Sequence, residues 1–222
     1  MTDLKNIQAV YFIGIGGIGM SALARYLSHL GIYTAGYDKT PGPITRQLLN
    51  ENISVTYKDD PKELPAAFRK YSKEQILAVY TPAIPADNNW FNFFKSNGYF
   101  LYKRAEVLGL ITRRISATAV AGTHGKTSVS VMTACIMKQS HIPSEAFLGG
   151  ISKNLNSNLM LSEKEAEIAV VEADEFDRSF LQLNPSAAVI TSIDADHLDI
   201  YKNLEDLKKT FSRFTSRIDK NG

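Results

Sequence analysis

The stretch Val120-Ala121-Gly122-Thr123-His124-Gly125-Lys126-Thr127-Ser128 decides the fold of the second half of this 222-residue chain. A small, β-capable run precedes it, and apolar side chains then recur at helical spacing at Val129, Met132 and Ile136. A strand, a glycine turn, Lys-Thr and a helix are typical of a phosphate cradle, because glycines let backbone N–H groups approach phosphate oxygens and the helix N-terminus adds its dipole. The alternative is a glycine turn with an exposed lysine, but this context favours a nucleoside triphosphate site.

The cradle supplies the first candidate site residues. Lys126 would provide a point charge for the outer phosphates, and the Thr127 hydroxyl can bind Mg²⁺. The general pattern has a glycine where this chain has Val120, so the loop is a shortened form. The candidate nucleotide-binding residues are Gly122, Thr123, His124, Gly125, Lys126, Thr127 and Ser128.

Composition and charge exclude several classes of protein. With 44% hydrophobic and 22% charged residues, the chain is expected to be globular and not disordered. Its 25 basic and 23 acidic residues are well mixed, so no nucleic-acid or membrane partner is expected. The single cysteine, Cys135, is expected to be a packed thiol. The apolar start has no basic leader and four glycines interrupt it, so we expect no signal peptide or membrane span and a cytoplasmic location.

The first half begins with a second glycine motif. Residues 9–13 form a short apolar run suited to a buried parallel strand, and a helix follows the loop 14–21, with Leu23, Leu27 and Leu30 on one face. We expect Gly31 to end this helix and residues 33–37 to form a second strand that leads to Asp38. This order is the dinucleotide-binding fingerprint. The glycines nevertheless indicate a phosphorylated ligand without naming it, so NAD and other diphosphates, UDP-sugars included, remain open.

Further strands and helices complete an expected first domain over residues 1–112. Strands are predicted at residues 53–56, 76–80 and 99–102, a helix start at Asp87-Asn88-Asn89, and a short helix at residues 104–111. The loop that begins at Thr81 lies at the carboxyl end of a strand, where ligands of parallel sheets bind. The aromatic run that contains Trp90, Phe91, Phe93 and Phe94 is expected to be core in preference to a base-stacking platform.

The second expected domain, residues 113–222, looks short. Only two more strands are clear, residues 167–171 and 187–191, with a glycine turn at Gly149-Gly150 and an Asn-rich loop at 154–158 between them. One helix face is predicted for Leu204, Leu207, Phe211, Phe214 and Ile218. The predicted fold is therefore α/β: a Rossmann-like parallel-sheet domain followed by a truncated P-loop-type ATP-binding domain.

Two acidic clusters follow the two late strands. Residues 172–177 contain four carboxylates, and residues 194–199 contain His197 among aspartates. Carboxyl ends of parallel strands share one edge, so both clusters are expected to face the cradle, where Mg²⁺ takes carboxylate and phosphate oxygens. Most of Asp174, Glu175 and Asp177 are expected to be helix caps or solvated.

With these pieces placed, the chain resembles the Mur ligase family, the ATP-dependent amide-forming enzymes of peptidoglycan precursor synthesis. The shortened loop is similar to the ATP signature of that family, and the resemblance spans nearly the whole chain. Within the family, the pattern is most similar to the members that join L-alanine to UDP-N-acetylmuramate. The supporting stretches are residues 14–21, 83–88, 104–106, 122–127, 171–177, 179–181 and 194–201.

The resemblance implies three domains that bind the UDP-sugar, ATP with Mg²⁺, and the amino acid; the last is absent from this chain, which is therefore expected to be inactive alone. It implies catalytic roles for Lys126, Glu172 and His197, and metal binding by Thr127, Glu172 and His197. It also implies that the lactyl carboxylate attacks the γ-phosphate, and that L-alanine then displaces phosphate from the acyl phosphate. The implied UDP-sugar-binding residues are Gly14, Gly16, Gly17, Gly19, Met20, Ser21, Asp38, Thr81 and Ala83.

Three other functions remain open. A sister ligase recycles murein peptides onto UDP-N-acetylmuramate, although Ala83-Ile84, Asp87-Asn88 and residues 180–185 favour the alanine-adding members. A nicotinamide oxidoreductase would explain only residues 14–38, and a non-catalytic nucleotide-binding module is the third. Pro82 and Pro85 make the substrate-edge loop stiffer than the form the family leads us to expect.

Overall fold

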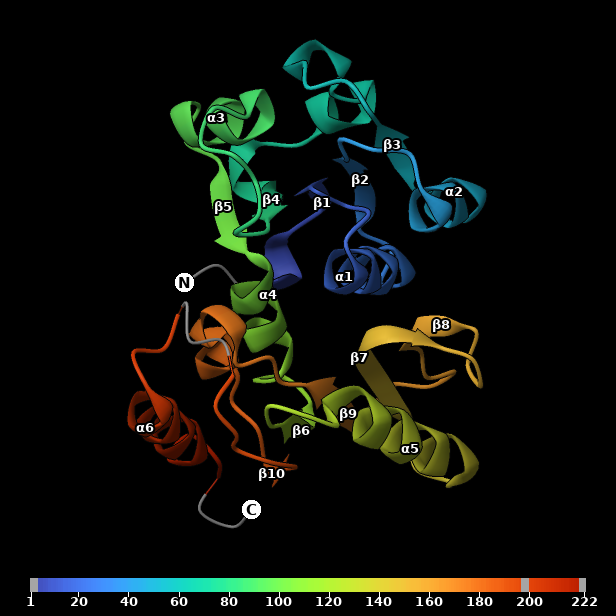
Figure 1. Ribbon diagram of the computed structural model, residues 1–222. Helices are drawn as coiled ribbons and strands as arrows, with labels where there is room; N and C mark the ends of the chain where they lie inside the picture. The colour runs from blue at the N-terminus through green and yellow to red at the C-terminus, as the bar shows by residue number, and fades with distance from the viewer. Residues whose placement is uncertain (1–3, 197–199, 220–222) are drawn as a thin grey trace. The chain divides into compact units, whose positions relative to one another are not determined.

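A computed structural model of the chain describes residues 4–196 and 200–219. The fold is α/β, as predicted, and Figure 1 shows its helices and strands. The chain divides into two compact units, Met1–Val107 and Leu108–Gly222, each built on a five-stranded sheet. The break lies within helix α4 (Arg104–Ile111), a few residues before the boundary expected at Thr112.

The sheet of the first unit is entirely parallel. Its strands are β1 (Ala9–Ile13), β2 (Tyr33–Tyr37), β3 (Ser54–Thr56), β4 (Ile76–Tyr80) and β5 (Phe100–Lys103). They lie in the order β3-β2-β1-β4-β5. Strand order therefore reverses between β1 and β4, and in open α/β sheets this switch point is where ligands bind. The loops that begin at Gly14 and Thr81 both leave the sheet there.

Helices precede and connect these strands. They are η1 (Leu4–Asn6), α1 (Ile18–His29), α2 (Pro43–Asn50), η2 (Pro61–Glu63), η3 (Ala66–Lys70), η4 (Lys73–Gln75) and α3 (Asn89–Ser96). Helix α1 ends in a Schellman motif, in which Gly31 takes a φ of +80° and the Ile32 N–H donates to the Leu27 carbonyl at 3.1 Å. Leu30, which the sequence placed on one face with Leu23 and Leu27, is the C-cap residue of α1 and is 48% exposed, whereas the other two are buried.

The aromatic run on α3 is core, which confirms the prediction. Trp90 has no exposed surface and stacks on Tyr11 with ring centroids 4.4 Å apart. Its indole Nε1–H donates to the Lys58 carbonyl at 2.9 Å, so the polar group of the ring is satisfied inside the unit. Phe94 is equally buried, and Phe91 packs against the same cluster.

The sheet of the second unit has five strands, two more than the sequence indicated. They are β6 (Ser116–Ala121), β7 (Ser144–Ser152), β8 (Ser157–Met160), β9 (Ile168–Glu172) and β10 (Ala187–Ile190). The order is β10-β6-β9-β7-β8, and β8 alone is antiparallel to its neighbour. The predicted glycine turn at Gly149-Gly150 is wrong, because both residues continue strand β7. The reversal comes later, through residues 153–156, where Asn156 takes a φ of +50°.

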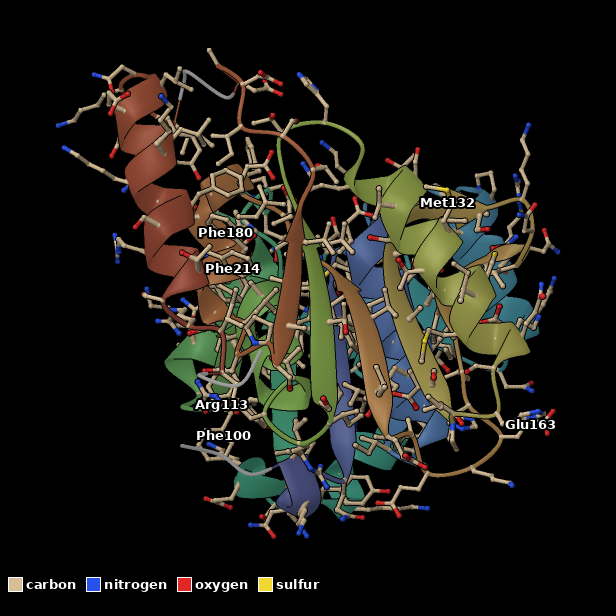
Figure 2. The ribbon with its side chains drawn as sticks, turned by 90° about the horizontal axis from the view of Figure 1, so that it is seen from below. Phe100, Arg113, Met132, Glu163, Phe180 and Phe214 are labelled. Atoms are coloured by element: carbon tan, nitrogen blue, oxygen red, sulfur yellow. The ribbon has the colours of Figure 1, made fainter. Side chains whose placement is uncertain are left out.

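Helix α5 (Lys126–Gln139) packs against this sheet through small residues. Ala134 lies in a buried cluster with Ala146, Leu148 and Val170. The apolar residues that predicted the helix instead face outward: Met132 is 57% and Ile136 69% exposed. Figure 2 shows Met132 on the outer side of α5. The spacing predicted the helix correctly but not its buried face, which Ser130 and Ala134 form, with Val131 and Met137 partly buried against the same cluster.

Helix α6 (Leu204–Thr215) packs on η5 (Phe176–Gln182) through aromatic rings. Phe180 stacks on Phe214 with centroids 4.7 Å apart, and the rings of Phe180 and Phe211 meet edge to face. Figure 2 shows Phe180 and Phe214 next to each other. Leu207, Phe211 and Phe214 are buried as the predicted face requires, whereas Leu204 is half-buried and Ile218 lies beyond the end of the helix. Across the described parts of the chain, every helix is too short or too polar to span a membrane.

Glu145 on β7 is a buried acid. The residue is only 5% exposed, and its Oε2 atom has no hydrogen-bond partner among the described residues. Burial raises the pKa of this carboxyl to about 7, because the charged form loses hydration that nothing replaces.

We expect Glu145 to make the stability of the protein fall as the pH rises. The folded-state pKa lies above the unfolded value of 4.5, so the stabilising contribution is complete below pH 4.5 and is lost as the pH rises through 7. At pH 8, Glu145→Gln should therefore unfold with a free energy about 3 kcal/mol higher than wild type. Urea unfolding at several pH values measures this, with exposed Glu165→Gln as the control. If Glu145→Gln raised the free energy of unfolding equally at pH 4 and pH 8, the raised pKa of Glu145 would be contradicted.

Candidate functional site

The glycine loop of the first unit lies at the switch point of its sheet. Gly14 has a φ of +87°, and its N–H donates to the Tyr37 carbonyl at 2.8 Å. A Cβ atom at Gly14 would lie 3.1 Å from Thr81 Cγ2 and 3.2 Å from Ile84 Cδ1. The structure thus brings the predicted loops after β1 and β4 together, and the positive φ with these close contacts favours glycine where they meet. Ala83 is exposed on the second loop.

Asp38 shapes this glycine loop. Its Oδ2 atom accepts a hydrogen bond from the Gly16 N–H at 2.7 Å, and its Oδ1 atom accepts one from the Thr40 N–H at 3.1 Å. The carboxylate at the end of β2 therefore holds the loop at the end of β1. The fingerprint position carries the acid that the sequence predicted, and its contacts in the structure are to the main chain.

The first turn of α1 offers main-chain N–H groups. Gly17 is the N-cap, and the first N–H groups of a helix have no intrahelical acceptor, so they favour an anion. Met20 and Ser21 are buried, and the Ser21 hydroxyl donates to the Ile18 carbonyl at 2.9 Å, so these two side chains are committed to packing. A Cβ atom at Gly19 would clash with the guanidinium of Arg104, which sequence reasoning did not select as a site residue.

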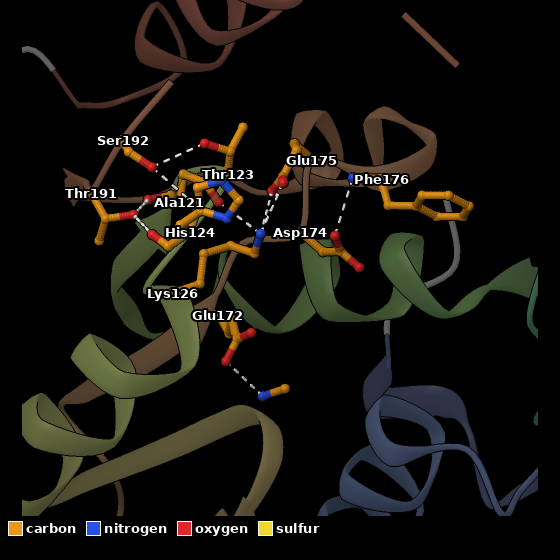
Figure 3. A network of polar contacts seen from close by, with 12 residues as sticks. Ala121, Thr123, His124, Lys126, Glu172, Asp174, Glu175, Phe176, Thr191 and Ser192 are labelled. Atoms are coloured by element: carbon orange, nitrogen blue, oxygen red, sulfur yellow. Dashed lines mark hydrogen bonds and ion pairs between the residues drawn. The ribbon is translucent and has the colours of Figure 1, made fainter. Parts of the chain in front are cut away.

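The cradle of the second unit is clamped by the segment that follows β10. The Thr123 N–H donates to the Ser192 carbonyl at 3.0 Å, and the His124 N–H donates to the Ser192 hydroxyl at 3.1 Å (Figure 3). The Thr191 hydroxyl donates to the His124 carbonyl. Gly122 has a φ of +132°, and a Cβ atom there would clash with the Thr191 hydroxyl. Thr191 and Ser192 fix the loop, although no sequence signal marked them.

Lys126 lies at the first turn of α5, behind Gly125, whose φ is +82°. Its ammonium donates to the Gly122 carbonyl at 2.7 Å. The same Nζ atom lies 2.8 Å from each carboxylate oxygen of Glu175 (Figure 3). Thr127 and Ser128 follow on the same turn and are exposed.

Thr127 and Glu172 form the second pair of the cradle. The Thr127 hydroxyl donates to Glu172 Oε1 at 2.8 Å, and Glu172 Oε2 accepts from the Gly149 N–H at 2.8 Å. A Cβ atom at Gly149 would clash with the Glu172 carboxylate, so this glycine allows the close approach. Glu172 is thus held between strand β7 and the start of α5.

Glu175 is the exception to the expectation that most of these acids cap a helix or are solvated: it stands at the N-cap position of η5, but its side chain makes no capping hydrogen bond. Its side chain is fully buried, and its partner is Lys126. Asp177 is exposed, as expected, and Asp174 accepts from the Phe176 N–H at 3.1 Å. Asp177 and Arg178 take φ values of +55° and +53°, and this irregular turn directs Glu175 inward.

Tyr201 supports the main chain of Glu175. Its hydroxyl donates to the Glu175 carbonyl at 2.6 Å, and the side chain has no exposed surface. Burial raises the pKa of Tyr201 to about 12, so this hydroxyl keeps its proton at neutral pH and remains a donor.

The two acidic clusters meet the cradle where the structure describes them. Glu172 and Glu175 contact Thr127 and Lys126, and the Asp194 N–H donates to the Thr123 hydroxyl at 3.0 Å. His197 lies outside the described residues. Within residues 4–196 and 200–219, no group of three or more His, Cys, Asp or Glu side chains could hold a metal ion. The hydroxyl of Thr127 beside the carboxylate of Glu172 nevertheless fits Mg²⁺, which commonly takes few protein oxygens and completes its shell with phosphate and water.

Comparison with known proteins identifies the family. The profile of the Mur ligase family, catalytic domain, matches residues 9–115, and that of the Mur ligase middle domain matches residues 120–222. The chain belongs to the Mur ligase family. It is 55% identical over 216 residues to a UDP-N-acetylmuramate–L-alanine ligase of Porphyromonas gingivalis, a match that covers 97% of this chain and 47% of the relative.

Other Mur ligases extend this result. A UDP-N-acetylmuramate–L-alanine ligase of Cytophaga hutchinsonii is 48% identical over 99% of this chain and 47% of its own length. A solved UDP-N-acetylmuramate-alanine ligase of Thermotoga maritima superposes with a TM-score of 0.82 at 26% identity, over 95% of this chain and 47% of that chain. The chain spans about half the length of the curated relatives it matches.

A murein-peptide ligase shares the fold. The structure of UDP-N-acetylmuramate:L-alanyl-γ-D-glutamyl-meso-diaminopimelate ligase from Neisseria meningitides superposes with a TM-score of 0.85 at 23% identity, over 97% of this chain and 70% of that chain. At this identity the likeness establishes the Mur ligase fold and does not separate the two acceptors.

Proposed function

We propose that this chain serves the ATP-dependent ligation of L-alanine to the lactyl carboxylate of UDP-N-acetylmuramate, in peptidoglycan precursor synthesis in the cytoplasm. The observation that carries the proposal is the 55% identity, across 97% of the chain, to a relative that bears the name of this ligase. The relatives at 48% identity bear the same name, which favours L-alanine over a murein peptide as the acceptor.

The second unit is the proposed ATP site. Thr123 and His124 already donate their N–H groups to Ser192, so within the proposed nucleotide-binding residues 122–128 the main-chain N–H groups at the start of α5 would face the phosphates. Lys126 would contact the outer phosphates. Thr127 and Glu172 would hold Mg²⁺ between them, with His197 proposed for a second metal. Bound Mg²⁺ would offset negative charge on the phosphates.

The proposed chemistry makes a poor acyl donor reactive. An oxygen of the lactyl carboxylate attacks the γ-phosphorus, and the bond to the β,γ-bridging oxygen breaks as ADP leaves. The amine of L-alanine then attacks the acyl carbon, loses a proton and displaces phosphate. Lys126 would keep its ammonium beside the phosphoryl oxygens during the first step, where charge redistributes.

The first unit is the proposed UDP-sugar site. The first turn of α1 offers N–H groups to a diphosphate, in the loop that Asp38 holds. Gly14, Gly16, Gly17 and Gly19 would allow the close approach, while Thr81 and Ala83 lie on the neighbouring loop for uridine or sugar. Arg104 adds a positive charge beside Gly19. Met20 and Ser21 would contribute through their main chain.

Calorimetric titration of the chain with UDP-N-acetylmuramate and, separately, with NADH tests this proposal. We expect the UDP-sugar alone to bind. Asp38→Ala should weaken that binding about tenfold, because a charged hydrogen bond to the loop is lost. Asp60→Ala, which removes an exposed carboxylate of the same unit, is the control. Binding of NADH alone, or of neither ligand, would contradict the proposed substrate.

A further inference from the structure

The charge of Lys126 is already neutralised within the cradle. Its ammonium lies 2.8 Å from both oxygens of Glu175 and 2.7 Å from the Gly122 carbonyl oxygen. Glu175 has no exposed side-chain surface, whereas Lys126 keeps 14%. The pair therefore consists of a fully buried carboxylate and a cation whose side chain is partly exposed and which has three N–H donors.

Glu175 is fixed in place by its own main chain. Its carbonyl accepts the Tyr201 hydroxyl at 2.6 Å and the Arg178 N–H at 2.9 Å. The Arg178 guanidinium lies over the Tyr201 ring, 5.3 Å from its centroid, and pairs with Asp206 at 2.8 Å. Together these contacts hold the left-handed turn at Asp177 and Arg178. These contacts fix the main chain from which the Glu175 carboxylate reaches Lys126.

A nucleotide must therefore compete with Glu175 for Lys126. A buried carboxylate is costly without its cation, so movement of Lys126 toward phosphate leaves Glu175 poorly compensated. If Lys126 instead stays and shares its third N–H, the negative charge of Glu175 still opposes that of the phosphates. In both cases Glu175 weakens the binding of phosphates.

We propose that Glu175 is the counter-ion of Lys126 in the nucleotide-free cradle, and that phosphates bind in competition with it. Glu175 is thus a positioning residue: it holds the ammonium at the mouth of the loop and lowers the affinity of the cradle for anions. This inference rests on the proposed ATP site. It adds that the affinity for the phosphates is limited by a residue that does not touch them.

Glu175→Gln tests the inference, because glutamine keeps the shape and one acceptor for Lys126 but removes the charge. Calorimetric titration of the full chain with ATP and MgCl₂ should give a Kd about tenfold lower for the variant than for wild type. Inorganic tripolyphosphate should show the same ratio, since it has neither base nor sugar. If the substitution merely loosened the structure, binding would become weaker. It would not tighten to the same degree for ATP and for tripolyphosphate.

Asp177→Asn is the matched control. It removes one charge from the same acidic run at an exposed position, and asparagine tolerates the positive φ found there. We expect its Kd to stay within about twofold of wild type. An unchanged or higher Kd for Glu175→Gln, or an equal gain for Asp177→Asn, would overturn the inference alone. Absence of ATP binding by wild type would overturn both the inference and the proposed ATP site. Thermal unfolding of each variant verifies that it is folded.

Discussion

Replacing Lys126 with methionine is expected to destabilise the second unit by about 4 kcal/mol, because it leaves the buried Glu175 charge without its cation. The magnitude follows from burial: Glu175 has no exposed side-chain surface, and the two groups are 2.8 Å apart. Methionine retains most of the apolar stem of lysine, so packing changes little. Urea unfolding followed by far-UV circular dichroism measures the loss.

The origin of that loss can be separated from other effects of the substitution. Adding Glu175→Gln to Lys126→Met should recover most of the stability, since the unpaired charge is then gone. Lys138→Met, at an exposed position of the same helix, should change the stability by less than about 0.5 kcal/mol. If the double variant were no more stable than Lys126→Met, the charge would not be the cause.

Trp90→Ala should destabilise the first unit by about 4 kcal/mol, because it removes the largest fully buried side chain of the chain and leaves a cavity. The indole stacks on Tyr11 and lies near Phe94, and its N–H satisfies the Lys58 carbonyl. Three contributions are therefore lost at once: apolar burial, ring stacking and a buried hydrogen bond. Urea unfolding followed by circular dichroism measures the change.

Two further variants separate the contribution of the ring from that of the indole N–H and provide a control. Trp90→Phe keeps a ring against Tyr11 but loses the N–H, so we expect it to retain about half of the lost stability. Lys95→Ala, exposed on the same helix, is the control and should be nearly neutral. A loss below about 1 kcal/mol for Trp90→Ala would mean that the aromatic cluster is not the core of this unit.

The strands of the first unit could be predicted because their signals are local, whereas helix α2 and the short helices η2, η3 and η4 were not predicted. Strands β1, β2 and β4 are unbroken apolar or β-prone runs, and Gly31 marks a helix end that the Schellman motif confirms. The second unit was harder. Strand β7 carries Gly149 and Gly150, which resemble a turn, and β8 has only four residues. Their strand conformation depends on pairing with β9 and with each other, which is tertiary information.

The candidate site shows the same division. The cradle and Glu172 follow from motifs, and their contact confirms that the acidic run lies beside the loop. Glu175 could not be distinguished from Asp174 or Asp177, since four carboxylates within six residues look alike in sequence. The environments of these carboxylates differ because of the left-handed turn at Asp177 and Arg178, a conformation that these residue types do not predict. Thr191 and Ser192 were missed because hydroxyl residues at a strand end are commonplace.

The hydrogen bond from the Gly149 N–H to Glu172 has a consequence for how this site tolerates mutation. The donor is a main-chain group, so replacing other side chains of strand β7 does not remove this hydrogen bond. The orientation of Glu172 therefore depends on the backbone of the sheet. The exception is position 149, where any side chain would collide with the carboxylate. Substitutions elsewhere in the strand can therefore leave the position of Glu172 unchanged. A single added methyl group at Gly149 is enough to displace its carboxylate.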